Sequence, residues 1–104
     1  MNKANSGISQ FLDKEGRIMR LPAKKSVRIA VLFYLAQKFE LDIKYTEKEV
    51  NEICDHWHTF QDYFILRRSL VDEELLFRKN DGSCYWRNEE FGFQNVGEEV
   101  KEDE

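Results

Sequence analysis

The chain has 104 residues, of which 41% are hydrophobic and 35% charged, a balance typical of one globular domain with a single core. Its formal charge of −4 comes entirely from residues 98–104, which hold five acids and one base, so a uniformly charged surface is excluded while a local basic patch is not. With no apolar run of membrane length, no signal peptide and only two cysteines, we expect a cytoplasmic protein with no membrane partner.

The first part of the chain shows little sign of regular structure, and we expect residues 1–10 to be flexible. One helical turn is predicted over residues 8–12. Polar and apolar side chains alternate over residues 17–21, which predicts a short edge strand. The folded domain is expected to span residues 11–93.

A long apolar helix is predicted over residues 24–39. Pro22 stands where a helix begins, because the N–H that proline lacks has no helical partner in the first turn. The helix is apolar on nearly every side, so several of its faces must be covered. We expect a homodimer contact, or a fused or separate regulator, to cover what the rest of the chain leaves exposed. Arg28 projects onto the apolar side, where its charge needs a carboxylate partner.

A second helix is predicted after a short strand at residues 43–45. The segment from Thr46 to Glu49 is a capping box, in which the hydroxyl and the carboxylate cap each other's amides. The apolar side chains of this helix fall on one stripe, which predicts a single buried face. They are Val50, Ile53, Cys54 and Trp57.

A third helix is predicted over residues 59–73, because the same capping pattern recurs there with an aspartate in place of glutamate. Projection at about 100° per residue places one set of side chains on the outer side. They are Gln61, Ile65, Arg68, Ser69 and Asp72. Arg67 falls among the apolar residues of the inner side, so we interpret it as a member of a structural ion pair. The candidate partners of Arg67 and Arg28 are Asp62 and Asp72.

A β-hairpin is predicted next, with strands at residues 75–79 and 84–87 joined by the turn-forming segment 80–83. Beyond it the chain becomes acidic and is interrupted by Gly92 and Gly97. Residues 94–104 are therefore expected to form a disordered acidic tail.

Helix, short strand, two helices and hairpin in this order predict an α+β fold of the winged-helix type, with three main helices and a C-terminal hairpin. In such a fold the helix at 59–73 is the recognition helix and the hairpin tip is the wing. Arginine and glutamine are suited to bidentate contacts with guanine and adenine, and lysine and arginine to contacts with phosphates. The predicted groove contacts are Gln61, Ile65, Arg68 and Ser69, and the predicted phosphate contacts are Lys24, Lys25, Arg78 and Lys79.

Metal binding and catalysis have little support in the sequence. Cys54 and His58 lie four residues apart, and Cys84 is a distant third ligand, but the spacing matches no zinc-finger pattern. Cys54 also fits the apolar stripe as a small buried hydrophobe. The chain has no glycine-rich phosphate loop, nucleophile elbow or paired-carboxylate motif. We expect no metal, no cofactor and no enzymatic activity.

Short motifs from residue 11 to residue 87 form a recognisable set. They are Phe11-Leu12-Asp13, Gly16-Arg17-Ile18, Leu21-Pro22-Ala23-Lys24-Lys25, Tyr45-Thr46-Glu47-Lys48-Glu49-Val50-Asn51, Trp57-His58, Leu66-Arg67-Arg68, Leu70-Val71-Asp72 and Tyr85-Trp86-Arg87. On these motifs the chain resembles a prokaryotic family catalogued only as a domain of unknown function, found alone or attached to helix-turn-helix transcriptional regulators. Its helix-to-hairpin block is also similar to the recognition helix and wing of MarR- and ArsR-type repressors. The resemblance implies a link to transcriptional regulation and assigns no catalytic or binding residue.

The sequence is consistent with two functions. The first is a small transcriptional regulator, or a regulator's accessory domain, that binds duplex DNA through a winged helix. The second is a protein-interaction or dimerisation module of the same fold without DNA binding, which the apolar start of the third helix at residues 63–66 favours. Salt-dependent binding to duplex DNA discriminates between them.

Overall fold

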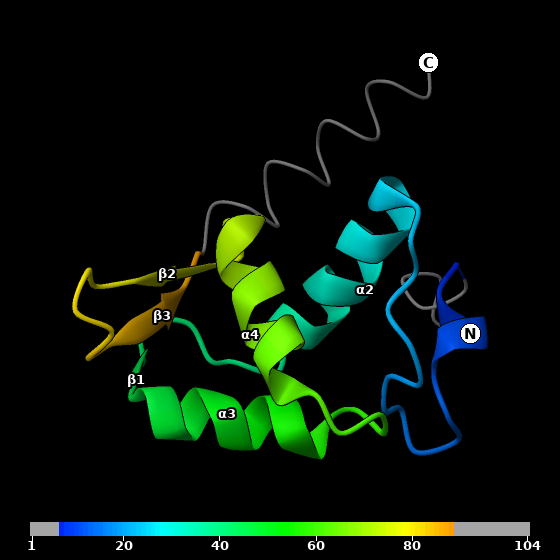
Figure 1. The fold of residues 1–104 in the computed structure, drawn as a ribbon, viewed down its shortest axis with the longest axis horizontal. Coiled ribbons are helices and arrows are strands. Elements are labelled where there is room, and N and C mark those ends of the chain that lie inside the picture. Colours follow the sequence, from blue (N-terminus) through cyan, green and yellow to red (C-terminus); the bar gives the residue numbers. More distant parts are fainter. Residues whose placement is uncertain (1–6, 89–104) are drawn as a thin grey trace.

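The computed structural model describes residues 7–88, which form an α+β fold of three α-helices and a small antiparallel three-stranded sheet (Figure 1). The helices pack together, and the sheet lies at one end of the group they make. In chain order the elements are η1 (Ser9–Phe11, a 3-10 turn), α2 (Lys25–Ala36), β1 (Lys44–Tyr45), α3 (Glu47–His56), α4 (Tyr63–Asp72), β2 (Leu76–Arg78) and β3 (Tyr85–Arg87). The predicted order of three helices and a hairpin is confirmed. The expected acidic tail at residues 94–104 lies outside the described part.

The sheet has the strand order β1-β3-β2, so the last strand is the central one. In the β2–β3 hairpin Phe77 lies opposite Trp86, and Arg78 lies opposite Tyr85. Because side chains alternate along a strand, Arg78 and Tyr85 share one side of the sheet, and the other pair shares the opposite side. The hairpin therefore presents an arginine and a tyrosine side by side.

The core lies between α2, α4 and the inner side of α3. Leu32 and Leu35 of α2 are fully buried, as are Leu66 and Leu70 of α4. Burying a leucine side chain contributes about 1.5–3 kcal/mol, so these residues fix α4 by its inner side. The opposite side of α4 is left for solvent or a partner.

The apolar surface of α2 is largely covered within one chain. The helix is shorter than the predicted 24–39 because three turn residues, Gln37 to Phe39, follow it, and Phe39 closes onto the core. Val27, Ile29 and Phe33 are half-buried, and the remaining large apolar residues of the helix are buried. The chain itself thus covers much of the apolar surface that motivated the expected homodimer, and the homodimer stays a prediction.

The segment predicted as a strand at residues 17–21 is instead an extended stretch with isolated bridges. Ile18 bridges to Leu12 on one side and to His58 on the other. Its amide donates to the carbonyl of Trp57 at 2.8 Å, and its side chain is fully buried. Ile8 is also buried, at 3% exposure, so the core reaches into the stretch expected to be flexible at 1–10.

The third helix begins at Tyr63, later than the predicted start at residue 59. Asp62 is its N-cap, and its carboxylate accepts the amide of Ile65. The preceding residues form a loop because His58 is buried and its Nε2 accepts the Asp62 amide at 2.7 Å. Gln61 has a φ of 57°, the left-handed region, which an α-helix does not allow. Tertiary contacts thus override a local capping pattern.

Candidate functional site

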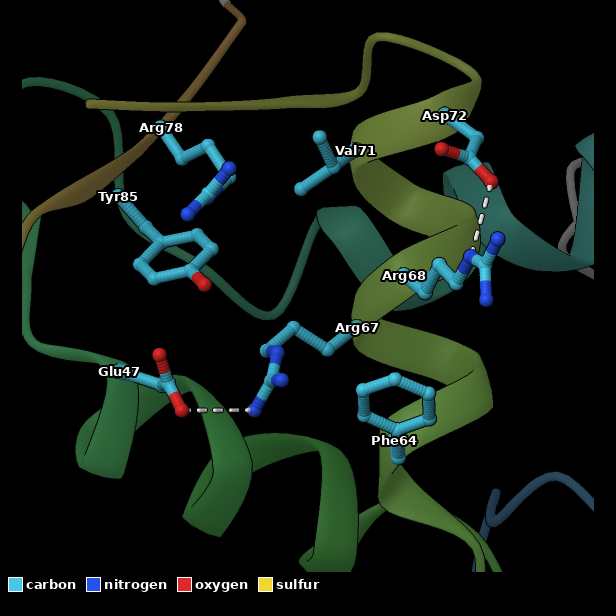
Figure 2. Close-up of a pocket in the computed structure, with 8 residues that line it drawn as sticks. All are labelled: Glu47, Phe64, Arg67, Arg68, Val71, Asp72, Arg78 and Tyr85. Carbon is cyan, nitrogen blue, oxygen red and sulfur yellow. Dashed lines mark ion pairs between the residues drawn. The ribbon is translucent and has the colours of Figure 1, made fainter. Parts of the chain in front are cut away.

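A hollow of about 230 Å³ lies where α4 meets the hairpin and the first turn of α3 (Figure 2). Three arginines and two carboxylates line it, so its lining carries one net positive charge. Aromatic and aliphatic side chains complete the wall. The lining residues are Glu47, Phe64, Arg67, Arg68, Val71, Asp72, Arg78 and Tyr85.

Arg67 is held in place on the floor of the hollow. Its Nη1 donates to Oδ1 of Asn51 and lies 3.4 Å from Oε2 of Glu47. Its guanidinium also stacks over the ring of Phe64, and its side chain is only 14% exposed. Arg67 is therefore paired, as expected. Its partners are Glu47 and Asn51 of α3, however, and not the predicted Asp62 or Asp72.

The expected acidic partners have other roles. Asp72 lies 3.8 Å from Nε of Arg68, and both side chains are more than 60% exposed. Ion pairs of that kind contribute about 0–1 kcal/mol, so Arg68 stays available to a ligand. Asp62 caps α4. Arg28 donates to the carbonyl of Ala23 and makes no ion pair with any residue in 7–88, which corrects the expected carboxylate partner.

Arg78 and Tyr85 enter the hollow from the hairpin. The Arg78 guanidinium lies over the Tyr85 ring, 6.0 Å from its centroid, and Nη2 makes a long 3.4 Å hydrogen bond to the carbonyl of Asn80. Tyr85 is only 3% exposed, yet its hydroxyl has no hydrogen-bond partner among the described residues. Figure 2 shows that hydroxyl pointing toward the space beside Arg67.

The hairpin tip is bent close to this site at Gly82. The residue has a φ of 76°, which glycine adopts readily and other residues rarely do. A β-carbon at this position would lie 3.0 Å from Nη2 of Arg78 and 3.6 Å from Oε1 of Glu47. The tip therefore passes close to Arg78 and Glu47, two residues that line the hollow.

The predicted DNA contacts fall into separate groups. Arg68 and Arg78 line the same hollow, and Lys79 follows at the hairpin tip. Ile65 and Ser69 lie on α4, at 41% exposure and half-buried respectively. Gln61 is on the loop before the helix, not on the predicted recognition helix. Lys24 and Lys25 are exposed at the start of α2, on the other side of the molecule from the hairpin (Figure 1).

Four residues of the hollow were not predicted from the sequence: Glu47, Phe64, Val71 and Tyr85. Each had an ordinary local explanation: Glu47 as a first-turn acid, Phe64 and Val71 as apolar helix residues, and Tyr85 as a strand residue. Only the packing of α3, α4 and the hairpin brings them together, and no spacing in the sequence signals that. Phe64 is 50% exposed and its neighbours Tyr63 and Ile65 about as much, so α4 starts with three consecutive exposed apolar residues.

Cys54 and His58 are structural in their contacts. Nδ1 of His58 lies 2.7 Å from the carbonyl of Cys54, and its Nε2 accepts the Asp62 amide, so both ring nitrogens are engaged. Burial raises the pKa of the Cys54 thiol to about 12, which keeps it protonated. Across residues 7–88 no three histidine, cysteine or carboxylate side chains are grouped so as to hold a metal ion.

A family model described as "Uncharacterized protein conserved in bacteria (DUF2087)" matches residues 17–87. The chain belongs to this family. The match runs from the extended segment before α2 to the end of β3, so the whole hollow lies inside the DUF2087 region. The resemblance to an uncharacterised prokaryotic family is thereby confirmed. No curated protein and no solved structure matches the chain. Within the described part, no helix is long and apolar enough to span a membrane.

Proposed function

We propose that this DUF2087 chain is a winged-helix domain of the bacterial cytoplasm that binds duplex DNA without catalysing a reaction, as a small transcriptional regulator or as a regulator's accessory domain. The order α2, β1, α3, α4, β2, β3, with β3 central in the sheet, supports this assignment. In it, α3 and α4 correspond to the helix-turn-helix pair, α4 to the recognition helix, and the β2–β3 hairpin to the wing.

The observation that carries DNA binding is the placement of exposed cations where α4 meets the hairpin. Arg68 and Arg78 line one hollow, and Lys79 directly follows Arg78 in the sequence. Arginine pairs with phosphate oxygens through two parallel hydrogen bonds, and such contacts position a protein on a duplex without reading its sequence. Gln61 is off the helix and Ile65 is apolar, so the proposal is backbone binding with little base readout.

A salt-dependence experiment tests this function. Binding of the full chain to a fluorescent random-sequence duplex is followed by anisotropy at two salt concentrations. Neutralising two phosphates predicts that affinity falls about 10-fold between 50 and 200 mM salt. The double variant Arg68→Gln, Arg78→Gln should lose this slope, whereas the control Arg20→Gln, at an arginine that stacks on Phe11 near η1, should keep it. No binding at low salt overturns the proposal.

A second candidate, a protein-interaction module of the same fold, is favoured by the exposed start of α4. Tyr63, Phe64 and Ile65 are 40%, 50% and 41% exposed. Consecutive exposed apolar side chains of this size are typical of contact surfaces. The partner is a second copy of the chain or a fused or separate regulator. Sedimentation of the chain and of Phe64→Ser tests the homodimer: a dimer that this substitution dissociates, together with no DNA binding, favours the module.

A further inference from the structure

We propose that the hollow between α4 and the hairpin is a binding site for one oxyanion, the phosphate or carboxylate group of a small ligand. This inference goes beyond the proposed function and does not rest on it, because the hollow is complete within one chain and needs no DNA. Its donors come from two elements, the hairpin and α4, and they converge on one space (Figure 2).

The first donor pair is Arg78 with Tyr85. The guanidinium of Arg78 is exposed and makes no ion pair with any described residue. The Tyr85 hydroxyl is an O–H donor on a side chain that is only 3% exposed, and no described residue accepts its proton. Among the described residues no buried side-chain polar atom lacks a partner, so this hydroxyl is open to solvent at the hollow, where a ligand oxygen can replace water as its acceptor. Oxygen atoms of a phosphate or carboxylate satisfy both groups at once.

The second feature is a cation that is already fixed. Arg67 is oriented by Asn51, by Glu47, whose carboxylate also lines the hollow, and by the Phe64 ring. Its remaining N–H groups therefore lose little conformational freedom when a ligand binds. The contacts with Glu47 and Asn51 use Nη1 of Arg67 and leave its other N–H groups for a ligand. The lining as a whole keeps one positive charge. The electrostatics favour an anion carrying one or two charges over a cation or a neutral amide.

The size and walls of the hollow limit the rest of the ligand. At about 230 Å³ it lies below the roughly 300–1,000 Å³ of pockets that enclose drug-sized molecules. Phe64 and Val71 form an apolar wall opposite the hairpin donors. The ligand class is thus a small phosphorylated compound or a short carboxylic acid, with its anionic group toward Arg78 and its carbon atoms against the wall.

The site is tested by NMR on the isotope-labelled full chain, with inorganic phosphate, acetate and chloride as probes at equal ionic strength. Phosphate and acetate should shift the side-chain Nε–Hε signals of Arg67 and Arg78 in a saturable way, with a dissociation constant near the millimolar range expected for so small a ligand. Chloride should not saturate. Arg78→Gln should weaken phosphate binding at least 10-fold, and Tyr85→Phe about 5-fold. In both variants the backbone amide signals of residues away from the hollow should keep their positions, which shows that the fold is intact.

The matched control is Arg20→Gln, which removes the same charge outside the hollow and should leave phosphate binding unchanged. Equal shifts with all three anions, or undiminished phosphate binding in Arg78→Gln, would overturn the site. The source of the oxyanion is distinguished by adding duplex DNA. Competition between phosphate and DNA identifies the backbone as one occupant, whereas phosphate binding with no DNA binding keeps the small-ligand site and removes the proposed function.

Discussion

Helices α3 and α4 have equal length and similar starts but opposite outer surfaces. Each has ten residues, and each is capped by an oxygen of the residue before it, Thr46 for α3 and Asp62 for α4. The outer side of α3 is charged and exposed, as expected of a helix that meets only water. The outer side of α4 begins with the exposed run from Tyr63 to Ile65 and continues with Arg68.

The difference shows that capping and burial explain why both helices form, but not what α4 displays. Water covers a charged helix surface at no cost, whereas exposed aromatic side chains remain favourable to bury. Arg67 links the two helices by reaching from α4 to Glu47 and Asn51 of α3. The surface that α4 leaves open and the hollow beside it are therefore held in place by α3, which also contributes Glu47 to the lining of the hollow.

The strongest test of this division compares the two sides of α4. Leu70 is fully buried and Phe64 is 50% exposed. Leu70→Ala should lower the free energy of unfolding by about 2–5 kcal/mol, through lost burial and a cavity. Phe64→Ala should cost less than about 1 kcal/mol, since much of its ring is already in water. Urea unfolding measures both, and similar losses would show that α4 has no free side.

The link between the helices is tested with the two neighbouring arginines. Arg67→Ala should lower the free energy of unfolding by about 1–3 kcal/mol, because it leaves Asn51 and Glu47 without their partner. Arg68→Ala should cost no more than about 0.5 kcal/mol, since its pair with Asp72 is exposed. Equal unfolding midpoints for the two variants would show that Arg67 does not join α3 to α4.

The buried thiol of Cys54, on the inner side of α3, predicts that the free energy of unfolding depends on pH. Burial raises the pKa of Cys54 to about 12 in the folded chain, above its value in the unfolded chain, so the unfolded state loses its proton first. The contribution of this thiol is complete below about pH 9 and is lost as pH rises toward 12, with a slope of at most about 1.4 kcal/mol per pH unit. Wild type and Cys54→Ala, unfolded in urea across this range, should differ by that slope. If the free energies of unfolding of the two proteins change with pH in parallel, the Cys54 thiol does not have the raised pKa that its burial implies.

The smallest expected effect concerns the caps. Thr46→Ala should cost about 1 kcal/mol, because the Glu49 amide loses its acceptor and the capping box is broken. Asp62→Ala should cost a similar amount at the start of α4. Thr59→Ala is the matched control, since Thr59 lies in a loop and heads no helix. The urea unfolding midpoints of the three variants are compared. A loss for Thr59→Ala as large as that for Thr46→Ala would show that the third helix begins at residue 59, as the sequence predicted.

Local patterns predicted what local energies decide. The capping box at Thr46, the hairpin, and the order of the elements could all be read from residues close in sequence. The start of α4 could not, because its loop is set by His58 and by the bridge from Ile18, forty residues away in the chain. The partner of Arg67 was also missed, because it belongs to another helix.

The hollow was the least predictable part. Arg68 and Arg78 were recognised as exposed cations, but nothing in their spacing placed them around one space with Tyr85. Side chains that meet there come from α3, α4 and the hairpin, so their proximity is a property of packing between elements. Sequence patterns describe the faces of single elements and carry little information about such meetings.

The bend at Gly82 gives the hairpin an unusual kind of control over its neighbour. A methyl group there would strain the backbone at its φ of 76° and would press on Nη2 of Arg78 from 3.0 Å away. The end of the arginine side chain would have to give way by a few tenths of an ångström, which would shift one donor of the hollow. Members of the family with a larger residue at this position should therefore hold Arg78 differently, even though position 82 does not line the hollow.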